Sequence, residues 1–370
     1  MINTENFYDY LLKLGIDKFY GVPDSLLKDI CACITTKANK KDHIITANEG
    51  NAVALASGAY IATGKPALVY MQNSGLGNAV NPLISLADEA VYKIPMLLMI
   101  GWRGEPGIKD EPQHAKQGQV TLTILEALGI KYIILSDDYQ RDLDEIYDLL
   151  IKEEKPVALI IKNGIFSSYK LTKPLNFYET SREKALEIIL ENIKLDDVVV
   201  STTGKTSREI FEIRESKGQG HKNDFLTVGS MGHTSSIALG ISLNTTKNVY
   251  CVDGDGSMIM HLGSLGVAAN KACKNFKYIV INNGAHESVG GQPSIGFDID
   301  IKNVLLGLGF KTVHIAKTES EIKSFVLELS KEDKAALVIF TRQGSRDNLG
   351  RPTLSPQENK LGLMKFIKGS

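Results

Sequence analysis

Short apolar runs recur along the first half of the chain, and each of them stops at small or polar residues. These runs predict strands near residues 18–22, 44–46, 67–71, 95–100, 132–135 and 157–161. The segments between them predict helices at 7–14, 52–62, 77–90, 120–128 and 138–152. Residues 105–118 are too irregular to predict an element. Strands that are apolar throughout are typical of a parallel sheet covered by helices on both faces.

The second half of the chain repeats this rhythm after an interruption. Residues 167–180 predict a linker. Beyond it, the pattern predicts strands at 198–201, 248–252, 277–281, 312–315 and 336–341, and helices at 182–192, 229–243, 301–308 and 319–330. We therefore expect two α/β domains, at 1–166 and 181–370, each built as a doubly wound parallel sheet. The similar order of parts in the two halves suggests an old duplication.

The segment from Gly254 to Asn283 has the pattern of a βαβ unit. A buried strand leads into a turn with the sequence DGDG, a helix of small residues follows, and a second buried strand ends at two asparagines. A right-handed crossover brings the carboxyl ends of both strands to one edge of the sheet, so Asp255 and Asn283 are expected to face one another. A carboxylate and an amide oxygen beside a glycine-rich turn suit Mg²⁺ carrying a diphosphate.

Composition argues against several classes of partner. The 370 residues carry 42 basic and 43 acidic side chains, a net charge of −1, without a basic block. We therefore expect neither nucleic acid nor an anionic membrane surface as a partner. Neither a secretory signal nor an apolar run long enough for a membrane helix is visible, and the four cysteines form no CxxC pair. These features predict a cytoplasmic protein with reduced thiols.

The string GDG, 25 intervening residues and then NN resembles the signature of thiamine-diphosphate-dependent enzymes. The resemblance implies a thiamine-diphosphate-binding fold with a pyrimidine-binding half and a diphosphate-binding half. A chain of this length leaves no room for the third, central domain that the family often inserts. The implied Mg²⁺ ligands are Asp255, Asn283 and the carbonyl of Ala285, and the implied diphosphate contacts are Gly254, Gly256 and Ser257.

Glu49 is the candidate for activating the cofactor. It stands at the mouth of a helix rich in alanine, valine and leucine, where loss of hydration raises the pKa of a glutamate. The resemblance places there the glutamate that hydrogen-bonds N1′ of the aminopyrimidine. The alternative is an acid that interacts with the helix dipole. By the same resemblance, the carbonyl of Gly229 contacts the 4′-amino group and Met231 supports the bent cofactor. Asn73 stands at the carboxyl end of a predicted strand, where the pyrimidine or substrate is expected. Core packing would explain Met231 nearly as well, and turn formation would explain Asn73 equally well.

Further strings resemble the branch of the family that decarboxylates phosphonopyruvate, with the sulfopyruvate decarboxylases next to it. They are GVPDS (21–25), NEGNAV (48–53), QNSGLGN (72–78), GWRGEPG (101–107) and KDEPQHAKQG (109–118). The resemblance implies a carboxy-lyase that converts 3-phosphonopyruvate to phosphonoacetaldehyde and CO₂, a step of phosphonate biosynthesis. Decarboxylation of sulfopyruvate or a related 2-oxo acid remains open, as does carboligation.

A substrate with a carboxylate and a phosphonate requires cationic partners besides the metal. Arg103 is the first candidate because a guanidinium binds two acid oxygens at once. His114 is the candidate for handling a proton. Lys109 and Lys116 are weaker candidates, since loop lysines are commonly solvated, and His233 and His286 rank lower.

The resemblance also predicts a homodimer or higher assembly, because in this family the two halves that share a cofactor come from different subunits. A nucleotide-binding protein is the main rival hypothesis. Gly204-Lys205-Thr206 looks like the end of a P-loop, but Val199 stands where its first glycine is required, and GLGNAV (75–80) lacks the third glycine of a dinucleotide fingerprint. A non-catalytic scaffold would not need Glu49.

Overall fold

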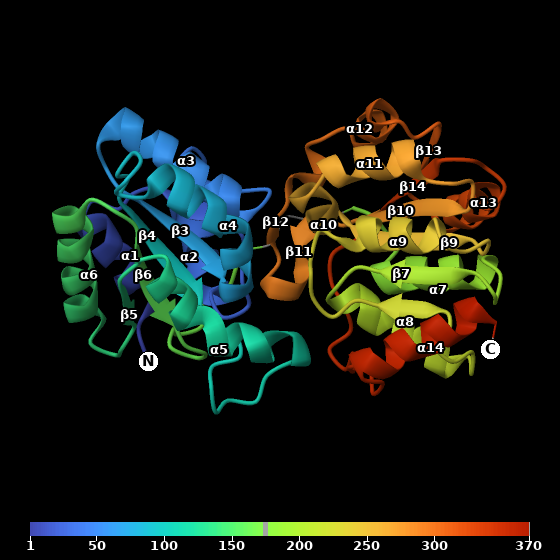
Figure 1. Ribbon diagram of the computed structural model, residues 1–370, viewed down its shortest axis with the longest axis horizontal. Helices are drawn as coiled ribbons and strands as arrows, with labels where there is room; N and C mark the ends of the chain where they lie inside the picture. The colour runs from blue at the N-terminus through green and yellow to red at the C-terminus, as the bar shows by residue number, and fades with distance from the viewer. Residues whose placement is uncertain (173–176, 370) are drawn as a thin grey trace. The chain divides into compact units, whose positions relative to one another are not determined.

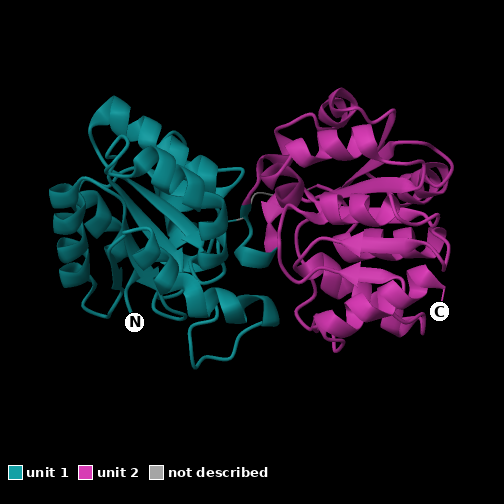
Figure 2. Cartoon of the chain, viewed as in Figure 1, with its two compact units in different colours: residues 1–173, 288–292 teal, residues 174–287, 293–370 magenta. Residues whose placement is uncertain are grey.

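The computed structural model describes residues 1–172 and 177–369. It divides into two compact units, the first formed by residues 1–173 with 288–292 and the second by residues 174–287 with 293–370 (Figure 2). Residues 173–176 of the predicted linker lie outside the described residues. Within the described ranges, no helix combines the length and the apolar character needed to cross a membrane.

The first unit is built on six strands that pair in parallel in the order β2-β1-β3-β4-β6-β5 (Figure 1). The strands are β1 (Phe19–Gly21), β2 (His43–Ile45), β3 (Ala67–Gln72), β4 (Met96–Gly101), β5 (Tyr132–Ile134) and β6 (Val157–Ile161). The helices are α1 (Thr4–Lys13), α2 (Lys28–Lys37), α3 (Glu49–Thr63), α4 (Leu76–Pro82), α5 (Pro112–Ala127) and α6 (Tyr139–Glu153).

Alternate strand residues of this sheet face two separate apolar layers. Leu68 and Tyr70 of β3 pack with α1, α2 and α6, whereas Val69 and Met71 pack with α3, α4 and α5. The central strands β3, β4 and β6 are thus buried on both faces, which is why they read as unbroken apolar runs rather than as alternating patterns.

The main sheet of the second unit also has six parallel strands, in the order β8-β7-β9-β10-β14-β13. Its strands are β7 (Val198–Ser201), β8 (Asp224–Leu226), β9 (Val249–Gly254), β10 (Phe276–Asn282), β13 (Thr312–Ala316) and β14 (Ala335–Phe340). Its helices are α7 (Arg182–Asn192), α8 (Lys205–Ser216), α9 (Thr234–Ser242), α10 (Asp255–Met260), α11 (Gly263–Lys271), α12 (Ile301–Leu308), α13 (Glu319–Leu329) and α14 (Pro356–Lys368). A small pair, β11 (Ala285–His286) and β12 (Gln292–Pro293), lies apart from it.

The two main sheets have the same topology. Numbered from the first strand of each unit, both follow the order 2-1-3-4-6-5, with helices on both faces (Figure 1). The predicted fold class, two doubly wound parallel sheets, is confirmed. In sheets of this kind ligands bind outside the carboxyl ends of the strands, where the strand order reverses. That point lies after β1 and β3 in one unit and after β7 and β9 in the other.

Some predictions of secondary structure were wrong, and three elements of the structure were not predicted. Residues 112–118, expected to be irregular, form the first turns of α5, with Pro112 at a position that tolerates a missing N–H. The helix expected from Gly229 begins only at Thr234, because Ser230 and Gly232 have positive φ values of 55° and 86°. Helix α2, helix α8 and strand β8 were not predicted at all.

Candidate active site

Asp255 and Asn283 meet at the carboxyl edge of the second sheet. Strands β9 and β10 are parallel neighbours in a register that pairs Gly254 with Ile281. The residues that follow the two strands therefore start at the same edge of the sheet. The predicted βαβ unit is confirmed. The backbone N–H of Asn283 is among the groups that donate to the carboxylate of Asp255. The side-chain oxygen of Asn283 accepts from the N–H of Ala285 at 3.1 Å, so Asp255, Asn283 and Ala285 lie together.

A loop covers the carboxylate of Asp255. Ser294 donates a short hydrogen bond to Oδ2 of Asp255, and Asn282 donates to the carbonyl of Gly296 at 2.6 Å. A Cβ on Gly296 would lie 2.6 Å from Oδ2 of Asp255, so the loop approaches this closely only because the residue is glycine. Burial raises the pKa of Asp255 to about 6, although the bonds from Ser294 and backbone N–H groups oppose the shift. A divalent cation beside this carboxylate would stabilise its charged form and so offset the cost of burying the charge.

The glycine-rich turn lies against Met231. A Cβ on Gly256 would meet the ring of His286 at 3.0 Å and the methyl group of Met231 at 3.3 Å. Ser257 is buried, and its hydroxyl accepts from the N–H of Gly232 at 3.0 Å. The turn that contains Gly229 is thereby tied to the start of α10. Burial lowers the pKa of His286 to about 4, so this imidazole is neutral at physiological pH.

Glu49 begins α3 in the first unit and is only 5% exposed. Burial raises its pKa, and a hydrogen bond from Nδ2 of Asn78 to Oε2, 2.7 Å long, opposes the shift in part. A Cβ on Gly75 would lie 2.5 Å from Cγ and Oε1 of Glu49. The carboxyl group therefore occupies space that only a glycine at position 75 leaves open.

Two buried polar side chains lie where the first sheet reverses its strand order. Asp24, after β1, is fully buried and accepts a 2.5 Å hydrogen bond from Gln72 at the end of β3. Burial raises the pKa of Asp24, against the effect of Gln72 and of the charge on Arg103. Asn73 donates to the carbonyl of Arg103 at 2.8 Å and to Thr121, whereas its buried Oδ1 has no hydrogen-bond partner among the described residues.

Arg103 and His114, the two candidates for substrate chemistry, lie together. Both contact Asp110, which was not predicted as a site residue. The guanidinium also donates to the hydroxyl of Ser25 at 2.7 Å. Lys109 and Lys116 are exposed, as expected for solvated lysines.

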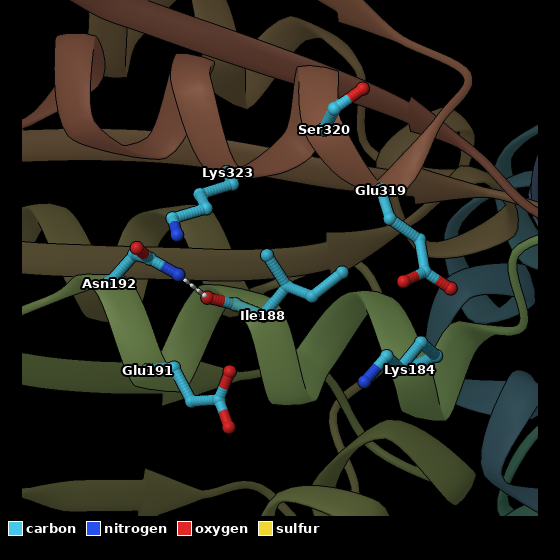
Figure 3. Close-up of a pocket in the computed structure, with 7 residues that line it drawn as sticks. All are labelled: Lys184, Ile188, Glu191, Asn192, Glu319, Ser320 and Lys323. Atoms are coloured by element: carbon cyan, nitrogen blue, oxygen red, sulfur yellow. Dashed lines mark hydrogen bonds between the residues drawn. The ribbon is translucent and has the colours of Figure 1, made fainter.

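Two other groups of polar side chains lie in the second unit. A pocket of the second unit lies between α7 and α13 (Figure 3), lined by Lys184, Ile188, Glu191, Asn192, Glu319, Ser320 and Lys323. Its charges are of both signs, and Lys184 pairs with Glu187 at 2.9 Å. All of its residues come from helices and none from a strand end, so it lacks the position expected of an active site.

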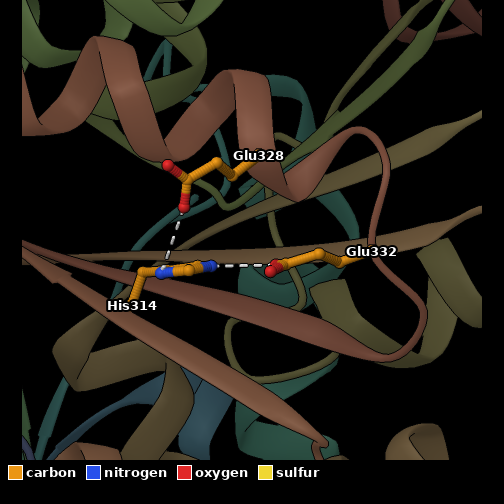
Figure 4. A group of neighbouring side chains, drawn as sticks. All are labelled: His314, Glu328 and Glu332. Carbon is orange, nitrogen blue, oxygen red and sulfur yellow. Dashed lines mark hydrogen bonds and ion pairs between the residues drawn. The ribbon is translucent and has the colours of Figure 1, made fainter.

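His314 forms the second cluster, with Glu328 and Glu332 (Figure 4). Its Nδ1 lies 3.9 Å from Glu328 and its Nε2 2.8 Å from Glu332, while the ring stacks on Phe325. The carboxylates face different ring nitrogens, whereas an ion takes one nitrogen from an imidazole. The arrangement is that of a hydrogen-bonded histidine rather than of a metal centre.

Comparison with known proteins adds to this geometry. Residues 3–136 match the thiamine pyrophosphate enzyme N-terminal TPP binding domain, and residues 202–340 match the C-terminal TPP binding domain. The chain is 32% identical to a phosphonopyruvate decarboxylase of Streptomyces viridochromogenes, over 99% of this chain and 95% of the relative. It is 26% identical to a sulfopyruvate decarboxylase of Methanosarcina acetivorans, over 96% and 95%. The sulfopyruvate decarboxylase subunit beta of Methanocaldococcus jannaschii is 31% identical over 49% of this chain and 94% of its own length.

Proposed function

The chain belongs to the thiamine pyrophosphate enzyme family, and from this premise we propose that it is a decarboxylase of 3-phosphonopyruvate. The reaction breaks the bond between the carboxylate and the carbonyl carbon, releases CO₂ and adds a proton to give phosphonoacetaldehyde. The observation that carries the proposal is the likeness to phosphonopyruvate decarboxylases over nearly the whole of both chains. Sulfopyruvate decarboxylation is the second candidate, because a decarboxylase of that substrate is also similar from end to end.

The residues at the edge of the second sheet fit a magnesium diphosphate. The carboxylate of Asp255, the amide oxygen of Asn283 and the carbonyl of Ala285 are hard oxygen donors of the kind Mg²⁺ prefers. Gly254 and Gly256 carry no side chain that would obstruct an anion, and Ser257 offers a hydroxyl beside them. Met231 lies next to Gly256, where it would support the cofactor, and Gly229 opens the same turn.

Glu49 fits the role of the acid that shares a proton with a cofactor ring nitrogen. Burial raises its pKa and so favours the protonated form more than exposure to water would. Gly75 and Asn78 hold the carboxyl group in place. When bound, thiamine diphosphate supplies the electron sink for the bonding pair that CO₂ leaves behind.

The polar residues after β4 suit the acid groups of the substrate. Arg103 would bind phosphonate oxygens, and His114 would hold or deliver a proton near the reacting carbon. Asn73, whose buried Oδ1 is an unused acceptor among the described residues, lies on the same sheet edge. A 2-oxo acid without a second acid group, such as pyruvate, would leave the guanidinium without that anion.

We further propose a homodimer or higher assembly whose active sites are shared between copies. Light scattering of the purified protein would test the assembly. Mixing an inactive Glu49→Gln chain with an inactive Asp255→Asn chain would test sharing, because mixed assemblies regain intact sites only if the two residues serve the same site from different copies.

The deciding assay is CO₂ release from phosphonopyruvate, sulfopyruvate and pyruvate in parallel, with and without thiamine diphosphate and Mg²⁺. We expect cofactor-dependent release, fastest from phosphonopyruvate. A preference for sulfopyruvate would establish the second candidate, and a preference for pyruvate would overturn both substrate assignments. Thermal stabilisation by ATP instead of thiamine diphosphate with Mg²⁺ would favour the rival nucleotide-binding hypothesis.

A further inference from the structure

We propose that Asp110 is a positioning residue that fixes Arg103 and His114 together, so that recognition of the second acid group and proton handling depend on one carboxylate. The inference rests on the proposed function and adds to it a residue that makes the site selective for a substrate with a phosphonate.

Asp110 is the acceptor for four different residues. Oδ2 accepts from Nε of Arg103 and from the N–H of Gly104, both at 2.8 Å. Oδ1 accepts from Nη2 of Arg103 in a short bond, from the N–H of Glu111 at 2.7 Å and from Nδ1 of His114 at 3.0 Å. Burial alone would raise the pKa of Asp110, but these donors outweigh it and hold the pKa far below its usual range. The group is therefore a permanent carboxylate.

The backbone on either side of Asp110 is closely packed. Gly104 has a φ of 69°, and a Cβ there would collide with the carbonyl of His114. A Cβ on Gly118 would collide with the carbonyl of Gly104. Trp102 donates from its indole nitrogen to the carbonyl of Gly118 at 2.9 Å, which ties the start of the loop to α5. The two backbone segments that carry Arg103 and His114 are thus packed directly against each other.

The contacts of Arg103 leave part of the guanidinium for a ligand. A guanidinium has five N–H groups in a planar fork. Within the described residues, Asp110 takes one on Nε and one on Nη2, and Ser25 takes one on Nη1. One N–H on each terminal nitrogen remains for the substrate, and their direction is set by the bidentate contact with Asp110. Bidentate geometry of this kind is what distinguishes a phosphonate site from a general positive charge.

The contact between Asp110 and His114 determines which ring nitrogen of His114 carries the proton. A carboxylate only accepts hydrogen bonds, so Nδ1 of His114 carries the proton that faces Asp110. In the neutral ring Nε2 is then the acceptor, and it is the nitrogen able to exchange a proton with a ligand. One side chain therefore sets the direction of Arg103 and the tautomer of His114.

The test compares Asp110→Asn with Asp144→Asn in the holoenzyme. Asp144 is an exposed carboxylate of the same unit that accepts a hydrogen bond from Tyr10 and takes no part in the site. Two quantities are measured: kcat for CO₂ release from phosphonopyruvate, and the Kd of phosphonoacetate, a phosphonate with a carboxylate but no ketone. Trp102 is the only tryptophan of the chain and adjoins Arg103, so its fluorescence reports binding without turnover.

The direction in which Kd changes shows whether Asp110 acts by orienting Arg103 or only through its negative charge. Removing a negative charge near an anion site would tighten phosphonoacetate binding if Asp110 acted only through its field. We expect the opposite, a Kd weakened at least about tenfold, because the fork of Arg103 loses its direction. We also expect kcat to fall at least about tenfold through His114. A Kd or a kcat within threefold of the Asp144→Asn value would overturn the inference.

A double-mutant cycle covers the case in which Asp110→Asn lowers the stability of the protein. If Asp110 acts through Arg103, then adding Asp110→Asn to Arg103→Ala changes the Kd of phosphonoacetate less than threefold further. Additive losses would contradict the coupling. If the wild type neither releases CO₂ from phosphonopyruvate nor binds phosphonoacetate, the proposed substrate is wrong. If the wild type does both and the Asp110 variants behave like Asp144→Asn, only the role of Asp110 is wrong.

Discussion

Replacing Gly75 by alanine is the sharpest test of the buried glutamate. The backbone of Gly75 has φ −70° and ψ −16°, which alanine adopts without strain, so any loss of activity comes from the new Cβ and not from the backbone. The new Cβ would lie 2.5 Å from Cγ and Oε1 of Glu49 and 2.6 Å from Cδ. Carbon atoms in contact prefer about 3.5–4.0 Å, so the carboxyl group must move by roughly 1 Å.

The cost of that movement has two parts. Overpacking a buried position destabilises a protein by about 1–3 kcal/mol. Displacing the carboxyl group also breaks its hydrogen bond with Asn78, 2.7 Å long, and leaving a buried polar group without its partner costs about 1–3 kcal/mol. A catalytic group misplaced by about 1 Å loses roughly 10²-fold in rate. We therefore expect Gly75→Ala to lower kcat for CO₂ release about a hundredfold.

Gly77→Ala is the matched control, because Gly77 lies two residues later, in α4, and a Cβ there has no atom within 4 Å. Alanine should stabilise this helix by up to about 1 kcal/mol and leave kcat unchanged. Turnover and thermal midpoint are measured for both variants. If Gly75→Ala keeps a kcat within threefold of Gly77→Ala, the position of Glu49 does not matter for catalysis and the reasoning fails.

Three further predictions concern the predicted cofactor residues. Glu49→Gln should lose at least roughly 10²-fold in kcat while keeping its fold, because an amide cannot share a proton, and near-normal turnover would remove Glu49 from the mechanism. Burial holds the pKa of Asp255 at about 6, above its ordinary value of 3.8, so the folded apoprotein loses about 3 kcal/mol of stability as pH rises through that window. Urea titrations should show this loss in the wild type, and Asp255→Asn should lack it. Thiamine diphosphate with Mg²⁺ should raise Tm more at pH 7.5 than at pH 5, because the metal requires the deprotonated carboxylate, and chelation of Mg²⁺ should abolish the difference; an equal rise at both pH values would refute the role of Asp255.

The fold and the edge at which the metal would bind were predictable because they depend on local pattern. Apolar runs marked the strands of both cores, and the crossover rule alone brought Asp255 and Asn283 together. The burial of Glu49 followed from the small residues of α3. These features lie within single supersecondary units, which is the range over which sequence pattern determines contacts.

The parts that escaped prediction depend on tertiary contacts. Asp110 resembles any loop carboxylate, and its four donor residues come together only because Gly104 adopts a positive φ against α5. Strand β8 has three residues and takes its place from neighbouring β7 rather than from its own sequence. Asp24 gives a signal only through the string GVPDS, since nothing local shows that it will be fully buried beside Gln72.

The repeated strand order has a consequence for how such an enzyme can be encoded. Each unit encloses its own apolar layers on both faces of its own sheet, so neither needs the peptide connection in order to complete a core. We therefore expect that a gene cut at that connection could still encode both cores, one on each polypeptide. The relatives named as separate alpha and beta subunits each match only part of this chain, and a single chain that carries both halves supplies them in equal amounts.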